Sequence, residues 1–135
     1  MHMLKTTAVA AVLAFAATGA AQAAGKCSQK AFAGVWLVTS SAGQLCLVEF
    51  SSKGDITESR CYLSGRFDSS VGSLSGTVKV ASNCKVSGEI TQKLGKKSEK
   101  LTISGQGAVG KDTNVIEATG SSKTGTVVIA GFQQW

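Results

Sequence analysis

The chain has 135 residues, 14 Lys and Arg against 8 Asp and Glu, a net charge of +6, 16 glycines, four cysteines and no proline. This length indicates one domain. Arg60 and Arg66 are the only arginines. The positive charge therefore does not indicate a sequence-specific nucleic-acid-binding protein, because such proteins rely on arginine. The only histidine, His2, is at the start of the chain, which leaves the remainder without the commonest general base and metal ligand.

Residues 1–23 have the pattern of a secretory signal peptide. Lys5 supplies a positive charge, residues 8–17 form an apolar run, and Ala21-Gln22-Ala23 matches the small-x-small signal of a signal peptidase. The apolar run is too short to cross a bilayer, which needs about 20 residues, so we expect no membrane span. We predict cleavage after Ala23, a single β domain over residues 24–135, and a periplasmic or secreted location where the cysteines are oxidised.

The rest of the chain alternates β-branched, aromatic and small polar residues, which is typical of strands. Gly, Ser and Asn turns divide it into eight predicted strands: 34–40, 44–51, 55–63, 73–81, 84–92, 100–107, 113–119 and 124–132. All connections are short except residues 64–72, and short connections favour antiparallel neighbours. We therefore predict an all-β antiparallel meander of about eight strands, closed into a small barrel, with a β-sandwich as the alternative.

The four cysteines allow three pairings, and the meander favours one of them. Cys27 and Cys84 lie at one end of the predicted barrel, whereas Cys46 and Cys61 lie at the other. We therefore predict the disulfides Cys27–Cys84 and Cys46–Cys61. A metal site is not indicated, because the cysteines include no close pair and no histidine accompanies them.

The length of the turn at Gly54 also determines whether Cys46 and Cys61 lie opposite each other. A two-residue loop at Lys53-Gly54 would place Cys46 opposite Cys61, but it would also place Glu49 opposite Glu58, where like charges repel. A three-residue loop with a bulge at Gly54 would relieve this repulsion and shift the cysteines by one residue.

The segment Ala33-Gly34-Val35-Trp36-Leu37, followed by Cys46-Leu47-Val48-Glu49-Phe50, resembles the start of calycin barrels such as the lipocalins, which share Gly-x-Trp on the first strand. Over residues 32–61 it is most similar to the secreted bacterial inhibitors of serralysin-type metalloproteases. The resemblance implies an eight-stranded barrel with Trp36 closing one end, and an N-terminal trunk that enters the protease cleft. In this chain a bridge at Cys27 would tie that arm down.

Lysines crowd the predicted fifth hairpin, with Glu99 as the only acid among them; they are Lys93, Lys96, Lys97 and Lys100. Such a run is usually a solvated loop, and the alternative is a contact for an acidic partner such as an anionic glycan or a lipid surface.

No catalytic, cofactor or metal motif is present among the carboxylates and hydroxyls. We therefore expect no enzyme and no cofactor, but an exported binding or inhibitory module, for example a protease inhibitor, that contacts an unknown protein through residues 24–29 or 64–72. The alternative is a protein that binds a small ligand or an anionic surface. A carrier would use the barrel interior, and a cavity of several hundred Å³ would favour it.

Overall fold

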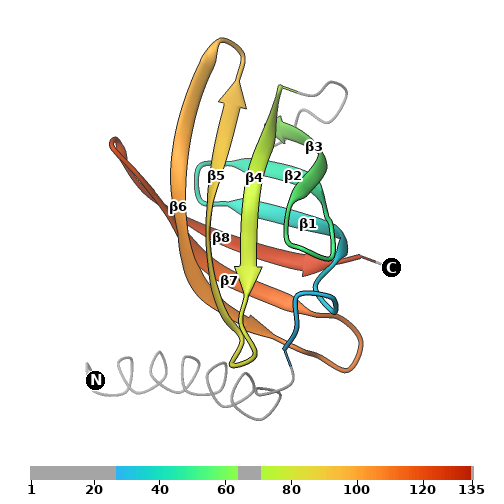
Figure 1. Ribbon diagram of the computed structural model, residues 1–135. Coiled ribbons are helices and arrows are strands. Elements are labelled where there is room, and N and C mark those ends of the chain that lie inside the picture. The colour runs from blue at the N-terminus through green and yellow to red at the C-terminus, as the bar shows by residue number, and fades with distance from the viewer. Residues whose placement is uncertain (1–26, 64–70, 135) are drawn as a thin grey trace, which may run out of the picture.

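In the computed structural model, which describes residues 27–63 and 71–134, eight antiparallel strands close into a barrel in chain order (Figure 1). The strands are β1 (Gly34–Ser40), β2 (Gln44–Phe50), β3 (Ile56–Leu63), β4 (Gly72–Val80), β5 (Lys85–Leu94), β6 (Lys97–Ala108), β7 (Val115–Ser122) and β8 (Gly125–Gln133). The predicted all-β meander and its closure are confirmed, and the sandwich alternative is wrong. The predicted signal peptide and most of the 64–72 connection lie outside the described residues.

Within residues 27–63 and 71–134, no helix is long and apolar enough to cross a membrane.

The β5–β6 hairpin is longer than the sequence predicts. β5 continues to Leu94 and β6 begins at Lys97, opposite it, so only Gly95 and Lys96 form the turn. Gly95 has a φ of +61°, which glycine adopts without steric cost. The hairpin therefore extends beyond its neighbours at the upper end of Figure 1.

Both predicted disulfides are confirmed. Cys27 pairs with Cys84, and Cys46 pairs with Cys61, its direct neighbour across β2 and β3. All four cysteines are buried. Disulfides of this kind are typical of proteins in oxidising compartments.

The β2–β3 hairpin combines the two registers that the sequence suggests. Three residues, 52–54, lie between Ser51 and Asp55, whose backbones are hydrogen-bonded. The bulge, however, is at Thr57 and not at Gly54, because Phe50 faces Ile56 while Glu49 faces Glu58. Compared with a two-residue loop, the three-residue loop shifts the pairing by one residue, and the extra residue in the bulge shifts it back. The cysteines therefore stay opposite, and the like-charged glutamates remain neighbours.

One end of the barrel is sealed by the segment that precedes β1, at the lower end of Figure 1. Trp36 is fully buried, its ring stacks on Phe32 with centroids 5.5 Å apart, and its indole Nε1 donates a hydrogen bond of 2.9 Å to the Phe32 carbonyl. The Cys27–Cys84 disulfide fixes this segment to the β4–β5 turn. Trp36 is thus a barrel-end aromatic, the role that the Gly-x-Trp resemblance implies for it.

Among the pairings between described residues, the one between β3 and β4 is the shortest. The strands meet at Cys61 and Gly72, and again at an isolated bridge between Asp55 and Thr77. Between these points the Ser59 side chain takes the place of the backbone ladder. Its Oγ donates to the Leu74 carbonyl at 2.8 Å and accepts the Leu74 N–H at 2.7 Å.

Candidate functional site

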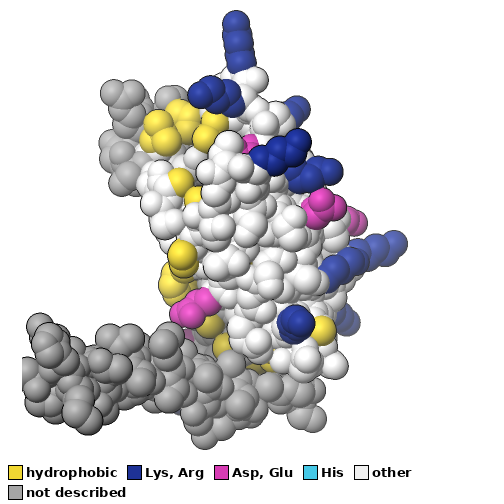
Figure 2. Space-filling model, turned by 90° about the vertical axis from the view of Figure 1, so that its left-hand side faces the viewer, with side chains coloured by type: hydrophobic (Ala, Val, Ile, Leu, Met, Phe, Trp, Pro, Cys, Tyr) yellow, Lys and Arg dark blue, Asp and Glu magenta, His cyan; other side chains and the backbone are white. Residues whose placement is uncertain are grey.

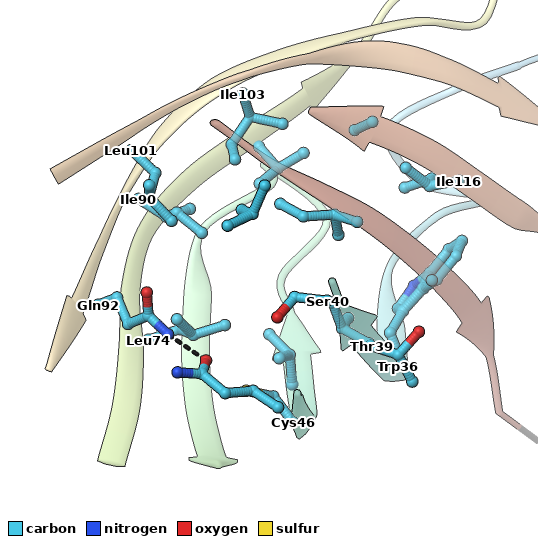
Figure 3. Close-up of a pocket in the computed structure, with 18 of the residues that line it drawn as sticks. Trp36, Thr39, Ser40, Cys46, Leu74, Ile90, Gln92, Leu101, Ile103 and Ile116 are labelled. Carbon is cyan, nitrogen blue, oxygen red and sulfur yellow. Dashed lines mark hydrogen bonds between the residues drawn. The ribbon is translucent and has the colours of Figure 1, made fainter. Parts of the chain in front are cut away.

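The barrel interior contains a cavity of about 80 Å³ with an almost entirely apolar lining (Figure 3). Inward residues alternate with outward ones along each strand, so every strand contributes to this lining. The larger apolar side chains around it include Trp36, Leu74, Ile90, Leu101, Ile103 and Ile116. Ala118 is a small residue in this lining, whereas at Gly131 the Trp36 ring takes the space, since a Cβ there would lie 3.3 Å from Trp36 Cε3.

The end of the cavity away from Trp36 carries two amides. Gln44 at the start of β2 is 9% exposed, and Gln92 near the end of β5 donates a hydrogen bond to its Oε1, drawn as the dashed line in Figure 3. Ser40 also lines this end. Ala42, in the β1–β2 turn, both lines the cavity and is exposed, so the cavity reaches the surface there.

This cavity is smaller than the pockets that hold drug-sized ligands, which measure about 300–1,000 Å³. Its 80 Å³ does not meet the criterion of several hundred Å³ that would favour a small-ligand carrier over a protein-binding module. The interior is thus closely packed around a small residual space.

The outside of β8, β1 and β2 carries a second feature, an apolar surface. The row Phe132, Leu37 and Leu47 runs across the three strands, because the register places each opposite the next. Val35 and Val128 extend it along β1 and β8. We call these five residues the outer apolar face.

Phe132, Leu47, Val35 and Val128 are among the five large apolar side chains that are strongly exposed in the described residues; the fifth, Leu63, lies at the end of β3. Figure 2 shows hydrophobic side chains gathered along the left-hand edge of the molecule, while most of the cationic side chains lie at the top and toward the right.

Acidic side chains border the outer apolar face. Glu49 lies opposite Val35 and Glu58 opposite Glu49, and Glu117 lies on β7 opposite Ala130. Glu49, Glu58 and Arg60 line a shallow hollow of about 210 Å³ together with Val35 and Leu47. Thr57 donates to Glu49 Oε1 at 2.9 Å, but neither glutamate is in an ion pair within the described residues.

The predicted lysine cluster does not converge on one point. Strand alternation places Lys97 on the same side of β6 as the inward Leu101, and Lys100 on the opposite side. Lys93 also points outward, since Gln92 lines the interior. Lys100 is 3.7 Å from Glu89, in the one ion pair found among the described residues. Figure 2 accordingly shows cationic side chains spread over this side with acidic ones between them.

The N-terminal arm is packed against the barrel from Cys27 onward. Gln29 Nε2 donates to the Val78 carbonyl at 3.1 Å, and Gln29 Oε1 accepts the Val80 N–H at 2.8 Å. Cys27 and Phe32 are both buried. The part of the candidate 24–29 contact that the structure describes is therefore held by a disulfide and two hydrogen bonds.

Among residues 27–63 and 71–134, no group of three His, Cys, Asp or Glu side chains is placed to hold a metal ion. Comparison with protein-family models, curated proteins and solved structures found no match for this chain.

Two features of the site were not predicted from the sequence. The outer apolar face has a visible signal, since β1 and β8 contain continuous apolar runs, Val35–Val38 and Val127–Ala130, where alternation with polar residues is expected of a half-solvated strand. The amide pair has a weaker signal. Gln44 and Gln92 are the two amide side chains in the cavity lining, and only the strand register shows that they meet.

Proposed function

We propose that this protein is an exported, non-enzymatic module that binds another protein through the outer apolar face. The observation that carries the proposal is the clustering of exposed apolar side chains on β8, β1 and β2. Contiguous exposed apolar patches on soluble domains commonly mark sites of protein interaction. The two disulfides support export, because such bonds persist in oxidising compartments.

The charges around the face favour a partner of defined chemistry. Glu49, Glu58 and Glu117 border it, and Arg60 is the one cation in the adjacent hollow. This acidic border contrasts with the chain's net charge of +6. A partner that presents apolar side chains flanked by lysine or arginine would cover the patch and neutralise the facing glutamates.

The partner would bind to exposed side chains, and it would not add a strand to the edge of the sheet. β1 pairs with β2 and β8, and β2 pairs with β1 and β3, so these strands have no unpaired backbone edge to which a strand can be added. Leu47 and Phe132, large and exposed, are suited to be the anchors of such a contact.

Protease inhibition is compatible with this proposal, but through a different surface from the one that the calycin-type inhibitors imply. Their trunk must be free to enter a cleft, whereas Cys27 and Phe32 are buried here. We propose that an inhibitory activity of this chain would act through the outer apolar face; the 64–72 alternative lies mostly outside the described residues.

The proposal is tested by affinity capture from the native exported protein fraction. The double variant Leu47→Glu, Phe132→Glu should lose the captured partner while its fold, checked by circular dichroism, is retained. The matched control Thr102→Glu, Ser104→Glu changes two exposed positions on the outer side of β6 and should capture as the wild type does.

Charge reversal adds a second arm to the test. Glu49→Lys with Glu58→Lys should weaken capture at low salt much more than at high salt, because exposed charges are screened. Equal capture by the wild type and the Leu47→Glu, Phe132→Glu variant would overturn the proposal. Binding to vesicles without any protein partner would overturn it as well.

A further inference from the structure

The inner cavity has an apolar part and a hydrogen-bonding part, an arrangement that imperfect packing alone would not require. Its body is apolar, and the end that reaches the surface at Ala42 carries the hydrogen-bonded amides of Gln44 and Gln92. The other end is closed by Trp36. A molecule that entered would thus meet hydrogen-bonding groups first and hydrocarbon beyond them.

We propose that this cavity binds a short, uncharged amphiphile, namely a primary amide or alcohol with an unbranched hydrocarbon tail. The tail would occupy the apolar space, and the head group would exchange hydrogen bonds with Gln44 and Gln92. Because an amide side chain both donates and accepts, the pair can satisfy a head group that does the same. This site is separate from the outer apolar face, since it uses the inward residues of the barrel.

The cavity volume sets the length of the tail. A cavity of 150 Å³ holds benzene, with six carbons, so by proportion 80 Å³ holds about three carbons, to which the carbon that bears the head group at Gln44 and Gln92 adds a fourth. A longer tail has to displace side chains from a closely packed interior, and such displacement is unfavourable. The affinity should therefore be greatest near four carbons.

The lining also sets the charge of the ligand. None of the residues around the cavity is Asp, Glu, Lys or Arg. A carboxylate placed there would lose its hydration without gaining a cation, which is strongly unfavourable. Butanamide or 1-butanol should therefore bind, whereas butyrate at neutral pH should not.

Trp36 provides the readout, because it lines the cavity. The chain has two tryptophans, so Trp135→Phe leaves Trp36 as the only one. In this background we expect 4-bromo-1-butanol to quench Trp36 fluorescence saturably, and 1-butanol and butanamide to compete with it. The series from ethanol to 1-octanol should show an optimum at three to five carbons.

Two variants locate the site. Ala118→Ile places a larger side chain in the cavity and should weaken binding at least tenfold, whereas Thr119→Ile, its outward neighbour, should not change binding. Gln92→Leu should weaken butanamide about tenfold, as expected for a lost hydrogen bond. If Ala118→Ile does not fold, methyl chemical shifts of wild-type Leu101 and Ile103 on titration with 1-butanol decide instead.

Quenching that does not saturate would overturn the proposal, as would butyrate binding equal to that of butanamide. An affinity that rises steadily to 1-octanol, or methyl shifts confined to residues outside the cavity, would also overturn it. Failure of these tests leaves the protein-binding proposal untouched, because the outer apolar face is not in the assay.

Discussion

Replacing Ser59 by alanine removes the side chain that joins the middle of β3 to β4. In the wild type its Oγ satisfies both backbone groups of Leu74, at 2.7 and 2.8 Å. The nearest direct pairings are Cys61 with Gly72 on one side and Asp55 with Thr77 on the other. Ser59→Ala therefore deprives a partly buried N–H and carbonyl of their partner.

The expected loss follows from these two hydrogen bonds. Each contributes about 1 kcal/mol net, and a backbone group left unsatisfied adds a further penalty, so we expect Ser59→Ala to lower the free energy of unfolding by about 2–3 kcal/mol. In a domain of this size such a loss corresponds to a fall in Tm of about 10 °C. The urea m-value should stay the same, because the surface exposed on unfolding is nearly unchanged.

The assay is urea unfolding followed by tryptophan fluorescence with both disulfides intact. Ser75→Ala is the matched control, since Ser75 is an exposed serine on β4, next to Leu74. Faster hydrogen exchange at the Leu74 amide should accompany the loss in Ser59→Ala. A loss below about 0.5 kcal/mol, or an equal loss in Ser75→Ala, would refute the reasoning that a side chain replaces the ladder here.

Three further outcomes are expected. Removing the Cys27–Cys84 bridge, which spans 57 residues, should cost about 4 kcal/mol by loop closure, against about 3 kcal/mol for the 15-residue bridge, as measured by denaturation of the two double Cys→Ser variants. Gly54→Ala should strongly reduce the yield of folded protein, because Gly54 has a φ of +91° and a Cβ there would lie 2.2 Å from the Val78 carbonyl; normal expression with an unchanged Tm would contradict this. Changing the four hairpin lysines to glutamine should leave Tm within about 2 °C, since solvated charges contribute little to folding, and should abolish any salt-sensitive heparin binding.

The strand order and both disulfides could be predicted from the sequence because they depend on local signals. Turn residues divide the chain into segments of similar length, and short connections leave antiparallel pairing as the simple topology. Once the meander is assumed, only one cysteine pairing joins like ends of the barrel. Cys46 faces Cys61 as expected even though the loop is longer than two residues, because the bulge at Thr57 restores the register.

The short β3–β4 pairing, the cavity and the outer apolar face depend on contacts between strands that are distant in the sequence. No local sequence pattern reveals such contacts. Whether β3 and β4 pair along their length depends on how the closed barrel divides its twist among eight interfaces. The cavity is the remainder after side chains from every strand have been packed, so a change of one residue, such as Ala118, alters it. The positions of the hairpin lysines depend on such relations too. Lys93 and Lys97, predicted to be in a loop, are in strands, where alternation decides the side on which each lies.

The outer apolar face and the inner cavity have a common origin in the composition of β1, β2 and β8. Leu47 and Val48 are neighbours in β2, yet Leu47 is exposed on the outside while Val48 lines the cavity. Strands that are apolar on both sides are normally covered by a further layer of structure. In this barrel the inner side is covered by the core, and the outer side is open at Phe132, Leu47 and Val35. A bound protein would supply the missing layer, which is why we assign the partner to this face and not to the lysine-bearing side, where outward residues are polar and already well solvated.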